Sequence, residues 1–193
     1  RMVLYKRPLL LFSDPERLKR IAGKSLQIVF AGKAHPHDVP AKGLIQGVFE
    51  MARQLETDIR VAYLPNYNLW TGALVTAGVD VWLNTPARPQ EACGTSGMKA
   101  AFNGVPSLST ADGWWAEAAK PNENGWVIDE AQTNSDVQAS NSLYQLLEES
   151  VIPRYREGPQ AWLPLMRGAI ATAVDFSAER MFAEYQMLYE RGS

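Results

Sequence analysis

The stretch Pro89–Asn103 reads PQEACGTSGMKAAFN, and it is the most informative part of the sequence. It begins with the carboxylate Glu91, continues through small residues and ends in a helical pattern that contains Lys99. Small residues let backbone N–H groups approach a ligand closely, and the first turn of a helix presents unpaired N–H groups to an anion. We therefore expect an anion site at the start of this helix, with Thr95 or Ser96 as its cap.

Lys99 is expected about one turn inside this helix, beside the bound anion. A lysine in that position has two interpretations: a counter-charge, or an amine linked covalently to a cofactor that carries a phosphate. An ordinary glycine-containing loop that leads into a helix is the structural alternative.

Composition limits the class of protein. The chain has 193 residues, a net charge of −2 and 21% charged residues, so no basic surface argues for a nucleic-acid partner. Its one cysteine, Cys93, excludes an internal disulfide framework and fits a reducing cytoplasm. No apolar run is long enough to span a membrane. The first residue is Arg1 and not Met, which suggests a piece of a longer protein.

Local patterns predict alternating strands and helices. Ser13–Glu16 has the cap and early proline of a helix start, and a helix is also expected over 38–55. Short apolar runs predict strands at the following ranges: 25–30, 59–64, 79–83, 105–109 and 126–128. A polar loop is expected over 129–141, and then helices over 142–150, 159–176 and 177–191. We expect Trp162, Phe176, Phe182, Tyr185 and Tyr189 to pack in the core.

The central stretch resembles the pyridoxal-phosphate attachment motif of the α-glucan (glycogen, starch and maltodextrin) phosphorylases, Glu-Ala-Ser-Gly-Thr-Gly-Asn-Met-Lys. Six of its nine positions match in Glu91–Lys99, and the departures are Cys93, Ser96 and Gly97. The first residues resemble a second motif, Lys-Arg-Ile-His-Glu-Tyr-Lys-Arg, which Arg1, Tyr5, Lys6 and Arg7 match in register, without the leading lysine.

Three shorter motifs of the same family follow predicted strands. Gly32, Lys33, Ala34 and Pro36 match Gly-Gly-Lys-Ala-x-Pro; Leu64, Asn66 and Tyr67 match Leu-x-Asn-Tyr; and Asp112 and Gly113 match an Asp-Gly pair. The paired Trp114 and Trp115 depart from the animal enzymes and look more like divergent bacterial members. Between Arg1 and Glu117 the five motifs occur in the family's order, and residues after Glu117 carry none.

The resemblance implies a fold and an architecture. The fold is α/β, a Rossmann-like doubly wound sheet that forms the C-terminal half of a glycosyltransferase-B fold. Residues 1–193 are expected to form a single cofactor-binding domain with a helical C-terminal part over about 130–193. An N-terminal domain of the same protein would be its partner.

The resemblance also implies the chemistry: phosphorolysis of an α-1,4-glucan to glucose 1-phosphate in the cytoplasm, with inorganic phosphate and pyridoxal 5'-phosphate in a Schiff base on Lys99. Arg1 and Lys6 would be the catalytic cations, with Arg1 on substrate phosphate. Lys6, Tyr67, Thr95 and Ser96 would hold the cofactor, while Tyr5, Glu91, Cys93 and Gly94 would hold the sugar. No metal is expected, since His35 and His37 are the only histidines and no carboxylate is placed to support them.

Three alternatives remain open. Glycogen and starch synthases, which use nucleotide sugars, carry two glutamates eight residues apart, and Lys99 stands where their second glutamate would be. An aminotransferase would use a lysine Schiff base and an acidic partner for the pyridine nitrogen, which the sequence does not reveal. A non-catalytic carbohydrate-binding domain would stack sugars on Trp70, Trp82, Trp114 or Trp115, although buried tryptophans are commoner.

Overall fold

The computed structural model describes residues 1–130 and 135–191, with Lys24 described by its backbone alone. Every described strand pair is parallel, and the strands form a two-stranded sheet of order β1-β2 and a three-stranded sheet of order β3-β4-β5. Their bounds are β1 (Gln27–Ala31), β2 (Arg60–Leu64), β3 (Trp82–Asn84), β4 (Ser107–Thr110) and β5 (Gly125–Ile128). All five predicted strands are present, although β3 begins at Trp82 and not at Val79.

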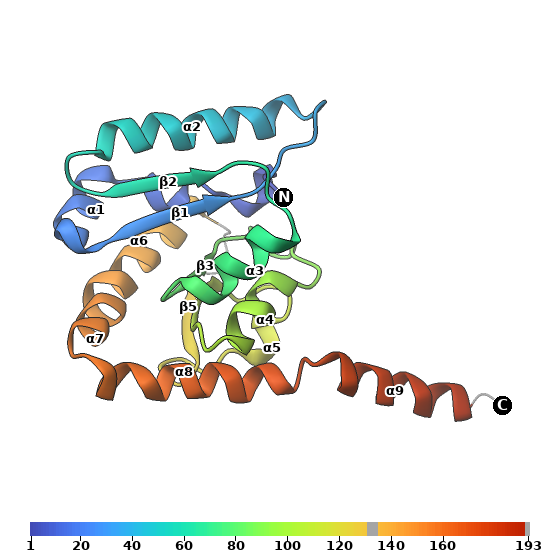
Figure 1. The fold of residues 1–193 in the computed structure, drawn as a ribbon. Helices are drawn as coiled ribbons and strands as arrows, with labels where there is room; N and C mark the ends of the chain where they lie inside the picture. Colours follow the sequence, from blue (N-terminus) through green and yellow to red (C-terminus); the bar gives the residue numbers. More distant parts are fainter. Residues whose placement is uncertain (131–134, 192–193) are drawn as a thin grey trace.

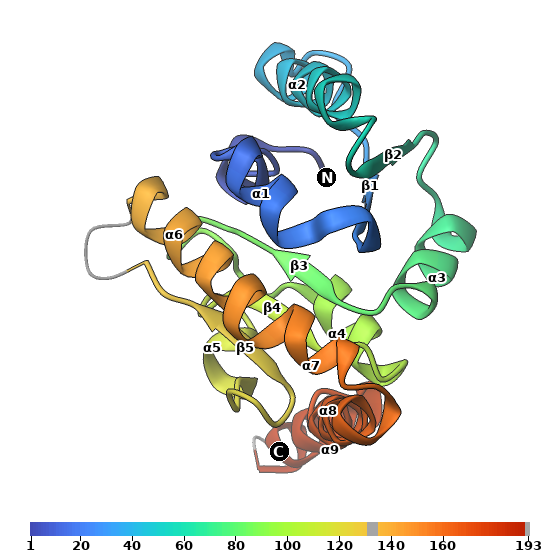
Figure 2. The same cartoon turned by 90° about the vertical axis from the view of Figure 1, so that its left-hand side faces the viewer.

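Helices flank both sheets (Figures 1 and 2). Their bounds are α1 (Pro15–Ala22), α2 (Val39–Leu55), α3 (Leu69–Gly78), α4 (Thr95–Phe102), α5 (Trp115–Ala118), α6 (Asp136–Leu146), α7 (Ile152–Arg156), α8 (Pro159–Val174) and α9 (Ala178–Arg191). Parallel sheets that are covered by helices confirm the α/β, Rossmann-like class that the sequence predicts.

The side chains just before α1, α2 and α3 act as caps. Asp14, Asp38 and Asn68 each accept a hydrogen bond from the backbone N–H three residues later, at 2.9 Å. Each cap satisfies one of the N–H groups that the first turn leaves unpaired, and α1 and α2 also carry a proline in that turn. These local signals explain why α1 and α2 begin where the sequence predicts.

The main core lies between the sheets and helices α1, α6 and α8. It contains Leu18, Leu55, Leu108, Trp126 and Leu165, each at most 1% exposed. Tyr144 joins this core to the N-terminal part of the chain, because its hydroxyl donates to Leu11 O at 2.9 Å and accepts from Asp14 N at 2.8 Å. Burial raises the pKa of Tyr144, so its hydroxyl stays protonated and keeps donating.

The predicted loop over 129–141 is wrong in its second half. Helix α6 begins at Asp136 and buries Ala139 and Ser140 on its inner face. Small residues at these positions let the helix pack closely against the turn Leu10–Phe12, and this tertiary contact outweighs the polar local composition. A π-helical turn at Leu147–Val151 also interrupts the helix predicted over 142–150. The first half of the loop includes residues 131–134, which lie outside the described residues.

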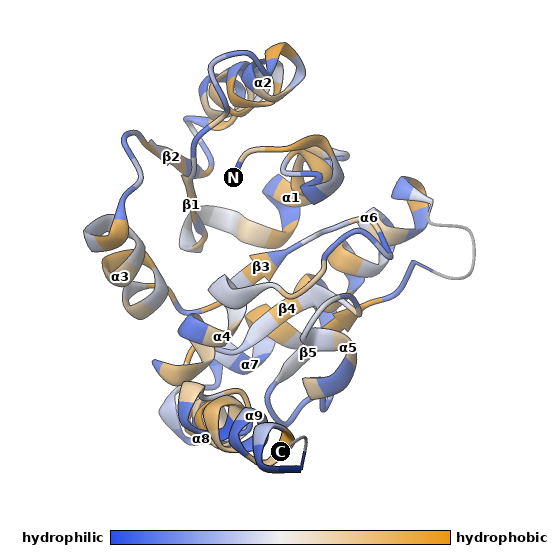
Figure 3. Ribbon diagram, turned by 90° about the vertical axis from the view of Figure 1, so that its right-hand side faces the viewer, coloured by the Kyte–Doolittle hydropathy of each residue, from blue (hydrophilic) through white to orange (hydrophobic). Residues whose placement is uncertain are grey.

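The prediction that all five late aromatic residues pack in the core is wrong for α9. Trp162 is buried, and Phe176 packs edge-on against Trp114 at 5.3 Å between ring centroids. Phe182, Tyr185 and Tyr189 are instead 67%, 51% and 75% exposed. Helix α9 continues past the end of α8 and away from both sheets (Figure 1). In the view of Figure 3, which looks toward the C-terminus, α9 overlaps α8 and carries both apolar and polar residues.

Candidate functional site

Lys6 and Glu91 meet at the carboxyl end of β3. Lys6 Nζ lies 2.6 Å from Glu91 Oε2, and their side chains are 28% and 9% exposed. Lys6 belongs to a 3₁₀ turn (Leu4–Lys6), which is attached to the segment after β3 by a hydrogen bond from Ala87 N to Tyr5 O of 2.7 Å. The first and second sequence motifs, which are more than 80 residues apart, are therefore in direct contact.

The start of α4 has no side-chain cap. Gly94 is its N-cap residue, with φ of +88°, and Thr95 is the first helical residue. The expectation that Thr95 or Ser96 caps the helix is wrong, because both residues lie inside the first turn, where their own N–H groups need partners. Both are exposed, and Gly94 takes a left-handed conformation that suits glycine. Gly97 N donates to Gly94 O at 3.1 Å, which leaves the N–H groups of Thr95 and Ser96 as the candidates for binding an anion.

The turn at residues 112–114 supports the loop before α4. Asp112 Oδ2 accepts from Glu91 N at 2.8 Å, and Trp114 N donates to Cys93 O at 2.7 Å. Gly113 lies so close that a Cβ on it would be 2.5 Å from Cys93 O, which is shorter than any normal contact. The Asp112-Gly113 motif therefore fixes the backbone that carries Glu91 and Cys93.

The N-terminal residues contact the motif Gly32–Pro36, which follows β1. Met2 N donates to Lys33 O at 2.9 Å, and Tyr63 Oη donates to Gly32 O at 2.8 Å. Arg1 itself is exposed.

Tyr67 and Lys99 belong to two of these motifs, but their side chains are not bonded to the Lys6–Glu91 pair in the described residues. The Tyr67 ring rests on α3, where its hydroxyl oxygen lies 2.8 Å from the position that a Cβ on Gly72 would take. Lys99 is exposed on α4, and its carbonyl accepts from Asn103 Nδ2 at 2.8 Å. Within the described residues, no hydrogen bond or ion pair joins the side chain of Arg1, Tyr67 or Lys99 to Lys6 or Glu91.

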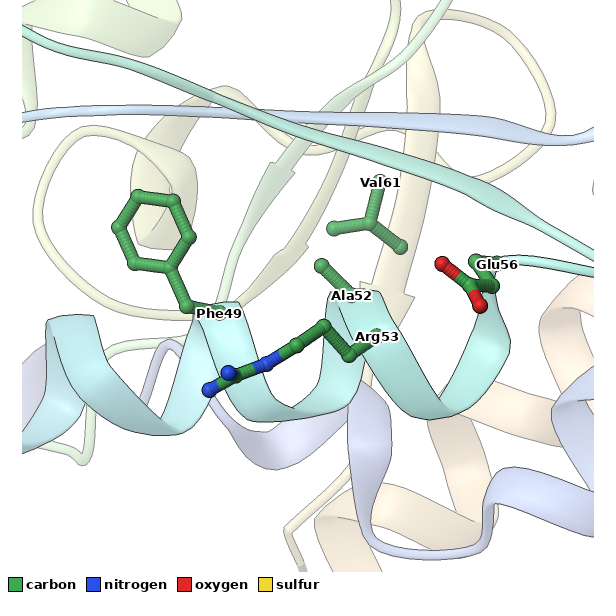
Figure 4. Close-up of a pocket in the computed structure, with 5 residues that line it drawn as sticks. All are labelled: Phe49, Ala52, Arg53, Glu56 and Val61. Carbon is green, nitrogen blue, oxygen red and sulfur yellow. The ribbon is translucent and has the colours of Figure 1, made fainter.

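Two other features do not form part of this site. His35 and His37 are exposed, and across residues 1–130 and 135–191 no three His, Cys, Asp or Glu side chains gather in a way that would hold a metal ion. A surface hollow between α2 and β2 is lined by Phe49, Ala52, Arg53, Glu56 and Val61 (Figure 4). It lies toward the amino end of β2, whereas ligands of parallel α/β sheets bind at the carboxyl ends.

Four residues that the sequence did not assign a role also shape the site: Arg7, Thr85, Asp112 and Glu130. Arg7 and Asp112 lie within motifs, so their motif positions were a usable signal. Thr85 and Glu130 follow strands β3 and β5 without any recognisable motif. Sequence reasoning had no means of pairing Arg7 with Glu130, which is 123 residues away.

The tryptophans make the carbohydrate-binding alternative unfavourable at two of its four positions. Trp114 and Trp115 are 4% and 1% exposed and pack against each other at 5.2 Å between centroids, so neither presents a ring face for stacking on a sugar. Trp70 is 73% exposed at the start of α3.

Comparison with known proteins identifies the family. Residues 10–123 match the sequence model of the carbohydrate phosphorylases, and this chain belongs to that family. The glycogen phosphorylase of Aquifex aeolicus is 43% identical over 196 residues, which cover 96% of this chain and 28% of that protein. The maltodextrin phosphorylase of Thermococcus litoralis is also 43% identical, over 96% of this chain and 23% of that protein. A glycogen phosphorylase of Mycobacterium tuberculosis is 40% identical over 96% of this chain and 23% of that protein.

The likeness extends into the part of the chain without motifs, since 96% of it aligns with these relatives. The chain spans about a quarter of their length. Membership of the phosphorylase family favours phosphorolysis over the nucleotide-sugar and aminotransferase alternatives. In the described part of the chain, no helix is both long and apolar enough to cross a membrane.

Proposed function

We propose that this chain is the cofactor-binding part of an α-glucan phosphorylase, which converts an α-1,4-glucan and inorganic phosphate to glucose 1-phosphate in the cytoplasm. Membership of the carbohydrate phosphorylase family supports the reaction class. The names of its glycogen and maltodextrin phosphorylase relatives support the glucan substrate. The chain's share of those relatives supports a partner domain within a longer protein.

The observation that carries this proposal is the Lys6–Glu91 pair at the carboxyl ends of the strands, on the loop that leads into the uncapped start of α4. Phosphorolysis brings a substrate phosphate next to a second phosphate group, so it needs cations and N–H donors held in place. Lys6 and the N–H groups of Thr95 and Ser96 have the right chemistry for one phosphate, and Arg1 for the other.

Pyridoxal phosphate fits the donor set, because α4 offers unpaired N–H groups for its phosphate and Lys99 offers an exposed amine for its aldehyde. When bound, this cofactor supplies a phosphate group that exchanges a proton with the substrate phosphate. Tyr67 would lie beside its ring. Tyr5, Glu91 and the backbone at Cys93 and Gly94 would bind sugar hydroxyls, and their role is to orient the glucan and exclude water.

A partner domain fits the surface of the chain as well as its length. Helix α9 exposes Met181, Phe182, Tyr185, Leu188 and Tyr189, each at least half exposed. Such a continuous apolar face on one helix is costly in water and is typical of a surface that another polypeptide covers. The remainder of the longer protein is the occupant that we propose.

Two experiments test the proposal. The longer protein should release glucose 1-phosphate from maltodextrin only when phosphate is present, whereas residues 1–193 alone should fold and remain inactive, since one domain cannot exclude water from a two-domain site. Full turnover by the 193 residues alone would contradict the placement of half the site elsewhere. Borohydride reduction followed by peptide mapping should find the cofactor on Lys99, and an adduct on Lys6 or Lys33 would refute that assignment.

A further inference from the structure

Arg7 has a buried guanidinium group at the carboxyl edge of the three-stranded sheet. Its side chain is 8% exposed. Arg7 Nε donates to Thr85 O at 2.9 Å, and Arg7 Nη2 donates to Pro86 O at 3.0 Å. These two carbonyls belong to the segment that leaves β3, so the guanidinium is attached to the beginning of the loop that leads to Glu91.

Two carboxylates hold the other side of the same group. Arg7 Nη2 also donates to Glu130 Oε1, and Arg7 Nη1 donates to Asp136 Oδ1 at 2.9 Å. Glu130 follows β5 and has a side chain that is 1% exposed, while Asp136 begins α6. A planar guanidinium with N–H groups in a fixed fork is suited to such a set of acceptors, and lysine cannot reproduce it.

The backbone beside Arg7 is bound to the same segment. Thr85 Oγ1 lies 2.9 Å from Lys6 O and 3.1 Å from Arg7 O, and it donates to this pair of carbonyls. Ala87 N donates to Tyr5 O at 2.7 Å. Arg7 itself has φ of +43°, a left-handed conformation that is strained for a side chain other than glycine and persists only where surrounding contacts impose it.

Residues 5–7 and 85–87 are therefore joined by both side-chain and backbone hydrogen bonds. Lys6 belongs to one segment, and Glu91 follows the other by four residues. The 2.6 Å distance between Lys6 Nζ and Glu91 Oε2 depends on how these two segments are held together. Neither Arg7 nor Thr85 contacts that ion pair with its side chain within the described residues.

We propose that Arg7 and Thr85 are positioning residues that fix Lys6 relative to Glu91 and to the start of α4, and so set the affinity of the site for phosphate. This inference rests on the proposed function, because it places Lys6 beside two adjacent phosphate groups, one from the substrate and one from the cofactor. Arg7 matches a position of a family motif to which the sequence analysis assigned no role. The inference gives this residue a function that does not require direct contact with substrate.

The test uses the longer protein that contains this chain and four variants. Thr85→Val removes the hydroxyl but keeps the shape of a residue that is only 6% exposed, and Thr85→Ser restores the hydroxyl. Arg7→Lys keeps the charge but loses the fork. Arg17→Lys is the matched control, since Arg17 forms a similar two-point pair with Glu148 (3.1 and 2.5 Å) on α1, away from the site.

Two readouts are required: the KM for phosphate in phosphorolysis, and the Kd of inorganic phosphate by calorimetry. Thr85→Val and Arg7→Lys should raise both about tenfold, as expected for a small displacement of a positioned group, while Thr85→Ser and Arg17→Lys leave both unchanged. A lower melting temperature of Thr85→Val with unchanged KM and Kd would mean a purely structural role, and would overturn the inference. An equal effect of Thr85→Ser would overturn it too.

The outcome also separates this inference from the proposed function. If the wild-type protein binds phosphate but shows no phosphorolysis, the proposed function fails, and the Kd series alone decides whether Arg7 and Thr85 act as positioning residues. If the wild-type protein binds no phosphate at all, both proposals are overturned.

Discussion

Gly97 lies in the first half of α4, where the related motif has asparagine, and we predict that Gly97→Asn destabilises this chain. A Cβ on Gly97 would lie 2.7 Å from Trp114 Nε1 and 3.1 Å from both Cε2 and Cζ2. The indole cannot easily move away, because Trp114 is 4% exposed and its ring contacts Phe176 and Trp115 at 5.3 and 5.2 Å between centroids. Its backbone N–H is also bound to Cys93 O.

Two opposing effects set the magnitude. Forcing extra atoms into a packed site costs about 1–3 kcal/mol, because side chains and backbone must shift. Replacing a glycine inside a helix with asparagine recovers only about 0.3 kcal/mol of helix propensity. Overpacking therefore outweighs propensity, and the free energy of unfolding should fall by about 1–3 kcal/mol.

Urea unfolding of Gly97→Asn, Trp114→Ala and the double variant measures this coupling directly. Trp114→Ala alone should cost about 3–5 kcal/mol, since it removes a buried indole. In the double variant the asparagine occupies space that the indole has left, so its cost should be smaller than the sum of the single costs by about 1–3 kcal/mol.

Gly43→Asn is the matched control, because Gly43 is an exposed residue of α2 whose Cβ would meet nothing within 4 Å. It should leave the free energy of unfolding nearly unchanged. If Gly97→Asn is as mild as Gly43→Asn, or if the costs in the cycle simply add, the claim that Trp114 takes the place of a side chain at position 97 is refuted.

Three further predictions concern stability, and each is measured by unfolding of this chain. Gly113→Ala should cost roughly 2–5 kcal/mol, because it combines a positive φ of +54° with a backbone clash, whereas Gly23→Ala has a positive φ in open space and should cost less; equal losses would contradict the clash. Asn124→Ala removes a 1%-exposed amide that makes three hydrogen bonds and should cost about 2–4 kcal/mol; a loss below 1 kcal/mol would refute this accounting. Arg17 holds the pKa of the Glu148 carboxyl below its usual value, so the stability from this pair is present above the unfolded-state pKa and is lost as pH falls through the folded-state pKa. Arg17→Met should therefore lower the free energy of unfolding by about 0.2–1 kcal/mol near neutral pH. It should have no effect at an acid pH below both the folded-state and the unfolded-state pKa of Glu148, and a loss of stability that does not depend on pH would contradict this prediction.

Local sequence signals were sufficient for the scaffold and for part of the site. The strands were predictable from short apolar runs, three of which are followed by Gly32, Pro65 or Asn84. Helices α1 and α2 were predictable because Asp14 and Asp38 stand just before a proline in the first helical turn. The family motifs singled out both Lys6 and Glu91, and the structure brings their side chains into an ion pair. Glu91 follows β3, whereas Lys6 lies in the 3₁₀ turn Leu4–Lys6, which is hydrogen-bonded to the segment after β3.

The remaining features depend on partners that are distant in the sequence. The predicted cap of α4 was wrong because Gly94, in a left-handed conformation, is the N-cap residue, so the helix begins at Thr95, earlier than a cap at Thr95 or Ser96 would allow. The first part of helix α6, before residue 142, was missed because its stability comes from packing on Leu10–Phe12, and not from its own composition. The exposed aromatic residues of α9 have the same sequence spacing as the apolar residues of a helix that faces the core. Periodicity alone therefore cannot distinguish a helix face that packs in the core of this chain from one that is exposed on it.

The electrostatic design of the site follows from the pairing of its one partly buried lysine. Glu91 offsets part of the positive charge of Lys6, so in the proposed function the attraction for an anion depends also on the start of α4 and on the exposed cations Arg1 and Lys99. The pair has a different use. Asp112 holds the backbone of Glu91, and Glu91 in turn holds the ammonium of Lys6, which has two further N–H donors. A phosphate that approaches Lys6 therefore meets a group already in position, and binding does not have to order a flexible side chain.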